Sequence, residues 1–373
     1  MMGWNSGNQR EDADLRVAGI TLLILAGLIS EARSETVDAL VKKCIGPGPQ
    51  IAIPACTELY DSVVDIRYVR VALMGRGTAY VDAGELDKGI ADLTKAIDIG
   101  ADDGGIFYIR AVAYIRKAEF DKALADLNEA VRLTPEHADS HHNRGHVYAA
   151  KGQFDRAIAD YTEALRLDPN RGDSFYNRGS AYLRKGNADS AIADLSNAVR
   201  LMPNHGDSFL DRASAYALKR DYRRAIADIN EAIRLKPKVA SLVYTRGNIY
   251  REMNDPDRAI ASYTEAIHLK PDYAIAYTNR GAVFEKKGEL DQAMADLNKA
   301  IRLTPKDAFA FNNRGLVFVK KGEMRQAIAD FTEAIRLKSD YVTALQNRGR
   351  AYLASGDAKR AAADAEKAKN LIK

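Results

Sequence analysis

The sequence has few of the residues that fill one large hydrophobic core. Only 8% of its 373 residues are aromatic, and 46% are hydrophobic. It has 10 Pro and 26 Gly, which are too few for a collagen-like or disordered chain. This composition argues against a closed barrel or a large enzyme lobe, and also against disorder.

Net charge is small as well. The chain has 55 Lys and Arg against 51 Asp and Glu, a formal charge of +4, and residues of the two signs are interspersed. Nucleic-acid-binding domains instead gather basic residues on one face. We therefore expect no nucleic-acid partner.

Sequence motifs of common enzymes are missing. There is no P-loop, no G-x-S-x-G, no H-E-x-x-H and no isolated Cys paired with a distant His. We therefore expect a protein that is not an enzyme and that uses no cofactor.

Long hydrophobic runs are scarce, and the one that stands out lies near the start. It extends from Val17 to Ile29, and small residues at Ser30 and Ala32 fit a cleavage site of the A-x-A type. A membrane-spanning helix needs about 20 apolar residues, which is longer than this run. We expect residues 1–32 to be a signal peptide, with no stable membrane span after cleavage and a periplasmic or cell-envelope location. The alternative is an uncleaved segment that tethers the protein to a membrane.

Cysteine occurs only twice, at Cys44 and Cys56. An even pair in an exported chain indicates a disulfide, because oxidising compartments preserve a bond that the cytosol reduces. A structural zinc site usually needs four ligands, so two cysteines are too few for one.

From about residue 70 the chain repeats itself with a period of 34 residues. An arginine, here called the marker Arg, is followed at once by Gly or Ala and four residues later by Tyr or Phe. The marker arginines are Arg76, Arg110, Arg144, Arg178, Arg212, Arg246, Arg280, Arg314 and Arg348. A period of this length indicates a solenoid, in which each unit buries its apolar face against the next.

Each unit is predicted to be a helical hairpin. In residues 138–171, His141, Arg144, Gly145 and Tyr148 recur at helical spacing, and Lys151-Gly152 then interrupts the pattern. A second amphipathic helix follows and ends at Asp168-Pro169. Below, the two helices of a unit are called its first and second helix.

This pattern of small, aromatic, Ala and Pro residues resembles the tetratricopeptide repeat family over residues 70–373. The resemblance implies an all-α, right-handed superhelical solenoid of helix-turn-helix hairpins. Nine repeats are expected, at 70–103, 104–137, 138–171, 172–205, 206–239, 240–273, 274–307, 308–341 and 342–373. Residues 33–69 are expected to form a degenerate hairpin that contains the Cys pair and caps the stack.

An Asp stands sixteen residues after nearly every marker Arg, in the second helix. These are Asp92, Asp126, Asp160, Asp194, Asp228, Asp296, Asp330 and Asp364, and Ser262 is the exception. We expect a ladder of Arg–Asp contacts between the helices of each unit, which is a structural role and not an anion site.

In the tetratricopeptide family the first helices line a concave groove, so the resemblance implies a set of ligand-facing residues. The row two residues before the marker Arg, here called the Tyr row, includes Tyr108, His142, Tyr176 and Tyr244. The row one residue before it, here called the Asn row, contains Asn143, Asn177, Asp211, Asn279, Asn313 and Asn347. It resembles the asparagine ladder with which some family members hold a peptide main chain. An acidic row five residues before the marker Arg contains Asp139, Asp173 and Asp207.

We therefore expect a scaffold that binds a protein or peptide in this groove. One alternative is a metal-binding or metal-delivery protein, because Asp139, His142 and His146 share one helix face and are possible transition-metal ligands. A second alternative is a purely structural protein that self-associates through its ends.

Overall fold

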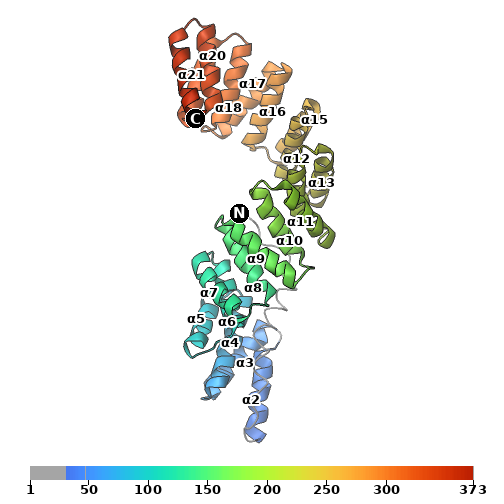
Figure 1. The fold of residues 1–373 in the computed structure, drawn as a ribbon, viewed down its shortest axis with the longest axis vertical. Helices are drawn as coiled ribbons and strands as arrows, with labels where there is room; N and C mark the ends of the chain where they lie inside the picture. The colour runs from blue at the N-terminus through green and yellow to red at the C-terminus, as the bar shows by residue number, and fades with distance from the viewer. Residues whose placement is uncertain (1–30, 47, 373) are drawn as a thin grey trace. The chain divides into compact units, whose positions relative to one another are not determined.

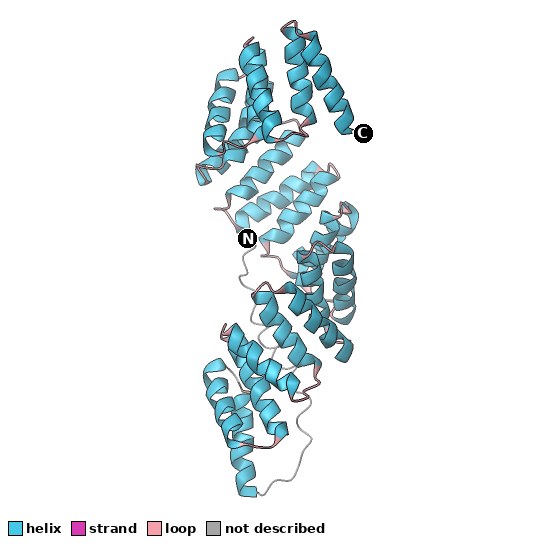
Figure 2. Cartoon of the chain, turned by 90° about the vertical axis from the view of Figure 1, so that its left-hand side faces the viewer, coloured by secondary structure: helices cyan, strands magenta, loops and turns pink. Residues whose placement is uncertain are grey.

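The computed structural model describes residues 31–46 and 48–372, and they are helical, without a strand (Figure 2). The chain forms two compact units, Met1–Leu201 and Met202–Lys373. In each unit consecutive helices pair as hairpins that stack on their neighbours (Figure 1), so the all-α solenoid prediction is confirmed. Residues 1–30, which hold most of the predicted signal peptide, lie outside the described residues.

The helices of the first unit follow the repeat pattern from residue 66 onward. They are α2 (Glu31–Cys44), α3 (Pro49–Ser62), α4 (Ile66–Asp82), α5 (Leu86–Asp98), α6 (Gly104–Arg116), α7 (Phe120–Leu133), α8 (Ala138–Ala150), α9 (Phe154–Leu167), α10 (Gly172–Arg184) and α11 (Ala188–Leu201).

The second unit continues with the same alternation of first and second helices. Its helices are α12 (Gly206–Leu218), α13 (Tyr222–Leu235), α14 (Ala240–Glu252), α15 (Pro256–Leu269), α16 (Ala274–Lys287), α17 (Leu290–Leu303), α18 (Ala308–Lys320), α19 (Met324–Leu337), α20 (Val342–Ala354) and α21 (Ala358–Ile372). None of the helices in the described part of the chain is long and apolar enough to span a membrane.

The small residue after each marker Arg makes room for the largest buried residue of the second helix. A Cβ added at Gly247 would lie 2.6 Å from a ring carbon of Tyr263, and one at Gly315 would lie 2.6 Å from Phe331. Both rings are fully buried. Because protein interiors are close-packed, a larger residue at either glycine would force the two helices apart.

The turn between the helices of a hairpin requires one residue with left-handed backbone geometry. Gly152 takes this conformation between α8 and α9, with φ of 73°. Arg220 occupies the same position between α12 and α13, with φ of 59°. A side chain costs about 1 kcal/mol in this conformation, so the missing glycine strains this turn without changing the hairpin.

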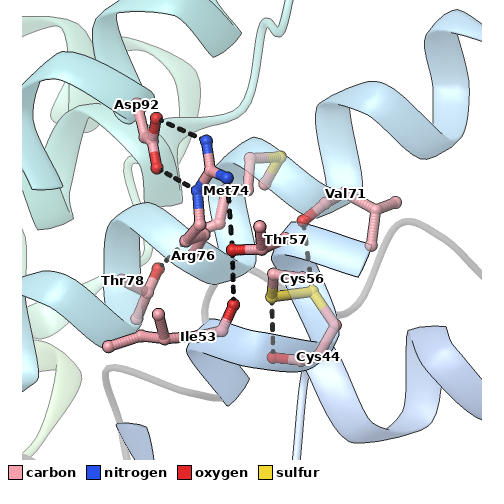
Figure 3. Close-up of a disulfide and its surroundings, with 9 residues drawn as sticks. All are labelled: Cys44, Ile53, Cys56, Thr57, Val71, Met74, Arg76, Thr78 and Asp92. Atoms are coloured by element: carbon pink, nitrogen blue, oxygen red, sulfur yellow. Dashed lines mark hydrogen bonds and ion pairs between the residues drawn. A yellow bond between two sulfur atoms is a disulfide. The ribbon is translucent and has the colours of Figure 1, made fainter. Parts of the chain in front are cut away.

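The amino-terminal hairpin, α2 and α3, is held by the disulfide expected from the sequence. Cys44 and Cys56 are bonded, and both are buried against α4 (Figure 3). A Cβ at Gly75 would lie 2.7 Å from one sulfur and 2.9 Å from the other. The bond therefore packs directly on the first helix of the repeat array.

Candidate functional site

Within each compact unit, marker arginines join three helices. Arg178 donates from Nε to Asp194 Oδ2 at 2.7 Å and from Nη2 to Asp194 Oδ1 at 2.8 Å. Its Nη1 donates to Thr162 Oγ1 of the preceding second helix at 3.0 Å. The Arg178 side chain is only 17% exposed. The Arg–Asp ladder is thus confirmed as a structural feature, and sequence analysis missed its bond to the preceding repeat.

The repeat without an Asp uses another carboxylate. Arg246 donates to Ser262 Oγ at 3.3 Å and to Glu265 at 2.5 Å. In the equivalent place of an earlier repeat, Glu163 instead accepts from Arg166, three residues on. Position 268 holds His instead of that Arg, so Glu265 is available to the marker Arg.

The Asn row and the Tyr row meet between neighbouring first helices. Asn143 Nδ2 donates to the hydroxyl oxygen of Tyr108 at 3.2 Å, and Asn279 Nδ2 donates to that of Tyr244 at 2.8 Å. Asn347 Nδ2 donates in the same way to Asn312 Oδ1 at 3.0 Å. Each bond links residues 35 positions apart. The amide groups are therefore oriented by the preceding repeat, which the sequence spacing alone did not indicate.

The residues of the two rows differ in exposure. Tyr108 is 4% exposed and His142 is 6% exposed, and Asn347 is also buried. Asn312 and Thr278 of the Tyr row are buried as well. The partly exposed residues are Asn143, Tyr176, Asn177, Asp211, Tyr244, Asn279 and Asn313. Tyr108 is thus part of the packed interface between repeats, and the Asn row offers more accessible polar groups than the Tyr row.

The acidic row is neutralised by cations of the chain itself. Asp139 pairs with Arg171, whose Nε also contacts Asp173 Oδ1 at 3.1 Å. Asp207 accepts from Lys236 Nζ at 2.7 Å. These carboxylates therefore contribute less negative potential to the first-helix surface than their number suggests.

Two histidines of α8, His141 and His142, are held by hydrogen bonds inside the first unit. His142 Nδ1 lies 2.7 Å from Ser174 Oγ, and its Nε2 lies 3.8 Å from Asp173. Burial lowers the pKa of His142 to about 4, against the opposing effect of Asp173. Asp160 raises the pKa of His141, which packs in the core with Nε2 at 2.9 Å from the carbonyl oxygen of Pro135.

The metal hypothesis does not agree with this geometry. Within residues 31–46 and 48–372 no group of three or more His, Cys, Asp or Glu side chains is placed to hold a metal ion. Asp139 is bound to Arg171, and His142 is bound to Ser174. Helical spacing placed Asp139, His142 and His146 on one face, but the neighbouring repeat engages two of them.

Two further features were not found from the sequence. The first is a cavity of about 400 Å³ with mostly apolar walls, lined by Gly105, Thr134, Pro135, Glu136 and His137. The second is a row of ion pairs at the turns, here called the rim ladder, in which a Lys at the end of a first helix meets an Asp of the preceding second helix. Its pairs are Lys117–Asp87, Lys151–Asp121, Lys185–Asp155, Lys287–Asp257 and Lys321–Asp291. Each Lys stands 30 residues after its Asp, and this fixed separation is the sequence signal that could have predicted the pairs.

Family models match most of the repeat array. The model described as TPR repeat matches residues 113–152, 145–186, 247–288 and 284–322, and the model described as Tetratricopeptide repeat matches residues 176–240 and 312–370. The chain belongs to the tetratricopeptide repeat family. As a tetratricopeptide repeat protein it carries a protein-interaction fold, and the matching models indicate no enzyme family.

Solved structures agree on the tetratricopeptide fold. A tetratricopeptide repeat protein from Parabacteroides merdae is 20% identical over 66% of this chain and 98% of its own, with a TM-score of 0.54. The Cut9–Hcn1 structure of the APC/C is 18% identical over 92% of this chain and 66% of its own, with a TM-score of 0.51. MamA is 31% identical over 44% of this chain and 96% of its own, with a TM-score of 0.42. No curated protein matches the chain.

Proposed function

We propose that this protein is a non-enzymatic scaffold of the cell envelope that binds an extended protein segment along its first helices. The orientation of the Asn row carries this proposal. Asn143 and Asn279 donate to the preceding repeat, and their Oδ1 atoms accept no hydrogen bond from the described residues. An amide that is held by its donor side presents its oxygen as a fixed acceptor. Such acceptors suit the main-chain N–H groups of an extended segment.

The proposed location rests on the disulfide. Cys44 and Cys56 are bonded and buried in the hairpin that precedes the repeats. Disulfides of this structural kind persist in oxidising compartments and are rare in the cytosol. We therefore place the binding face outside the cytosol, and we expect its partner there.

Site-specific photocrosslinking tests the binding face. A benzophenone amino acid placed at Asn177 or Asn313 should crosslink a discrete partner in the intact cell envelope. The matched control is Gln292, an exposed residue of the second helix α17. Equal crosslinking from Gln292 and from the Asn row would contradict the proposal.

A second measurement uses the crosslinked partner segment as a synthetic peptide. Asn279→Ala removes one fixed acceptor and also the bonds to Tyr244 and Asn248. Since one hydrogen bond contributes about 1 kcal/mol, we expect roughly a fivefold loss of affinity by calorimetry. An unchanged affinity for Asn279→Ala and Asn143→Ala alike would contradict a role for the Asn row in main-chain binding.

A further inference from the structure

The rim ladder is interrupted at two places in the second unit. Between α13 and α14 the Asp position holds Arg223, and the Lys position holds Met253. Between α19 and α20 the same two positions hold Arg325 and Ser355. At both places an Arg replaces the acidic residue and the cationic partner is also gone, so neither junction can form the ion pair.

The first interruption leaves positive charge without a partner. Among the described residues, no ion pair or hydrogen bond involves the side chain of Arg220 or Arg223, and both residues are exposed. Asp221 lies between them, but its carboxylate accepts from Arg224 Nε at 2.5 Å and from the Arg224 backbone N–H at 3.1 Å.

The carboxylates of the next turn are also engaged elsewhere. Asp255 pairs with Arg258 at 2.6 Å, and Asp257 pairs with Lys287 at 2.8 Å. Arg220 and Arg223 therefore have no direct ion pair among the described residues, although Asp221 attracts Arg223 through space. Met253 is 38% exposed at the neighbouring turn, where the rim ladder otherwise has Lys.

Because neither cation contributes an intramolecular bond and Arg220 occupies a strained turn position, we infer that Arg220, Arg223 and Met253 form a second docking surface for an acidic protein segment with apolar side chains. Guanidinium groups bind carboxylates in a bidentate manner, and Met adapts to varied apolar side chains. This surface lies at the hairpin turns and is independent of the Asn row.

A narrow protein segment fits this surface better than a flat anionic membrane. The rim on the far side of Met253 carries Asp257 and Asp291, whose side chains are 81% and 94% exposed. Both are paired with Lys, so a bilayer surface would meet Asp–Lys pairs without net charge beside the arginines, whereas a single extended segment contacts Arg220, Arg223 and Met253 without covering those pairs.

Restoring the rim ladder tests this inference. Arg223→Asp combined with Met253→Lys recreates the ion pair of the other junctions and removes two of the three docking residues. Arg325→Asp combined with Ser355→Lys makes the same repair at the other interruption and is the matched control. The full chain is titrated at low salt against a fluorescent peptide of Glu-Glu-Leu repeats, and binding is followed by anisotropy.

We expect the first repair to weaken peptide binding at least tenfold and the control repair to change it less than twofold. Thermal melting should show both variants folded. Arg220→Gly should weaken binding severalfold without lowering Tm, because glycine relieves the left-handed turn. Absence of peptide binding by the unmodified chain, or equal losses in both repaired variants, would overturn the inference. Binding to phosphatidylglycerol vesicles but not to the peptide would also overturn it, in favour of a membrane surface.

Discussion

The Arg178–Asp194 pair offers a direct test of how the repeats are held together. Arg178→Leu leaves the Asp194 carboxylate, whose side chain is 8% exposed, without its two charge-assisted bonds. Removing one partner of a buried ion pair typically costs about 3–5 kcal/mol. We expect Tm to fall by roughly 10 °C, since each kcal/mol corresponds to about 2–4 °C in a chain of this size.

The double variant Arg178→Leu, Asp194→Leu should be much closer to the unmodified protein. It loses the bond to Thr162, worth about 1 kcal/mol, but leaves no buried charge. The chain provides its own control in Arg246→Leu, because the partners there are Ser262 and the half-exposed Glu265. We expect this variant to lose only about 1 kcal/mol.

The assay is thermal and urea unfolding of the unmodified chain and its variants at pH 7, followed by circular dichroism. Hydrogen exchange on α10 and α11 would localise the effect, since repeat arrays can unfold in parts. The pairing argument would be refuted if Arg178→Leu cost as much stability in a chain that already carries Asp194→Leu as it does when Asp194 is present. A loss in Arg246→Leu as large as that in Arg178→Leu would refute the role given to the buried carboxylate.

Three further predictions concern the disulfide and the buried histidine. Replacing Cys44 and Cys56 by Ser should cost about 3 kcal/mol of local stability, because the bond closes a short loop in the unfolded chain, and hydrogen exchange should quicken in α2 and α3 but not in α20 and α21. Gly75→Ala should lower Tm because its Cβ meets both sulfurs, and reduction should lower Tm less in this variant than in the unmodified chain; an unchanged Tm for the oxidised variant would contradict the contact. His142 has a folded pKa of about 4 against an ordinary 6.5, so the unfolded state binds more protons between these values and stability falls as pH drops from 6.5 to 4. The loss, about 3 kcal/mol when complete, should be smaller in His142→Asn, and identical urea-unfolding profiles from pH 7 to 4.5 would contradict it.

The marker arginines show which contacts can be predicted from the sequence and which cannot. Their spacing to the Asp of the same hairpin predicted a contact between the two helices of one repeat, and this contact is present. The bond from the same guanidinium to the preceding second helix depends on how two hairpins pack. Glu265 is a similar case, because it replaces a missing Asp only where no neighbouring Arg competes for it.

The surface formed by the first helices shows more clearly what sequence spacing cannot predict. The family resemblance placed Tyr108 among the ligand-facing residues, and helical spacing placed His142 among possible metal ligands. Packing of the neighbouring repeat instead buries both and engages them with Asn143 and Ser174. Helical spacing determines which side chains share a face, but it does not determine how much of that face the next hairpin covers.

The sequence by itself determined the 34-residue repeat, its hairpin form and the Arg–Asp pairing, because these depend on spacing within one repeat. Only the tertiary structure decided which polar groups remain accessible, which carboxylates are already neutralised and where the rim ladder leaves cations unpaired. Those properties depend on contacts between repeats, and burial and charge pairing are settled only when neighbouring hairpins stack.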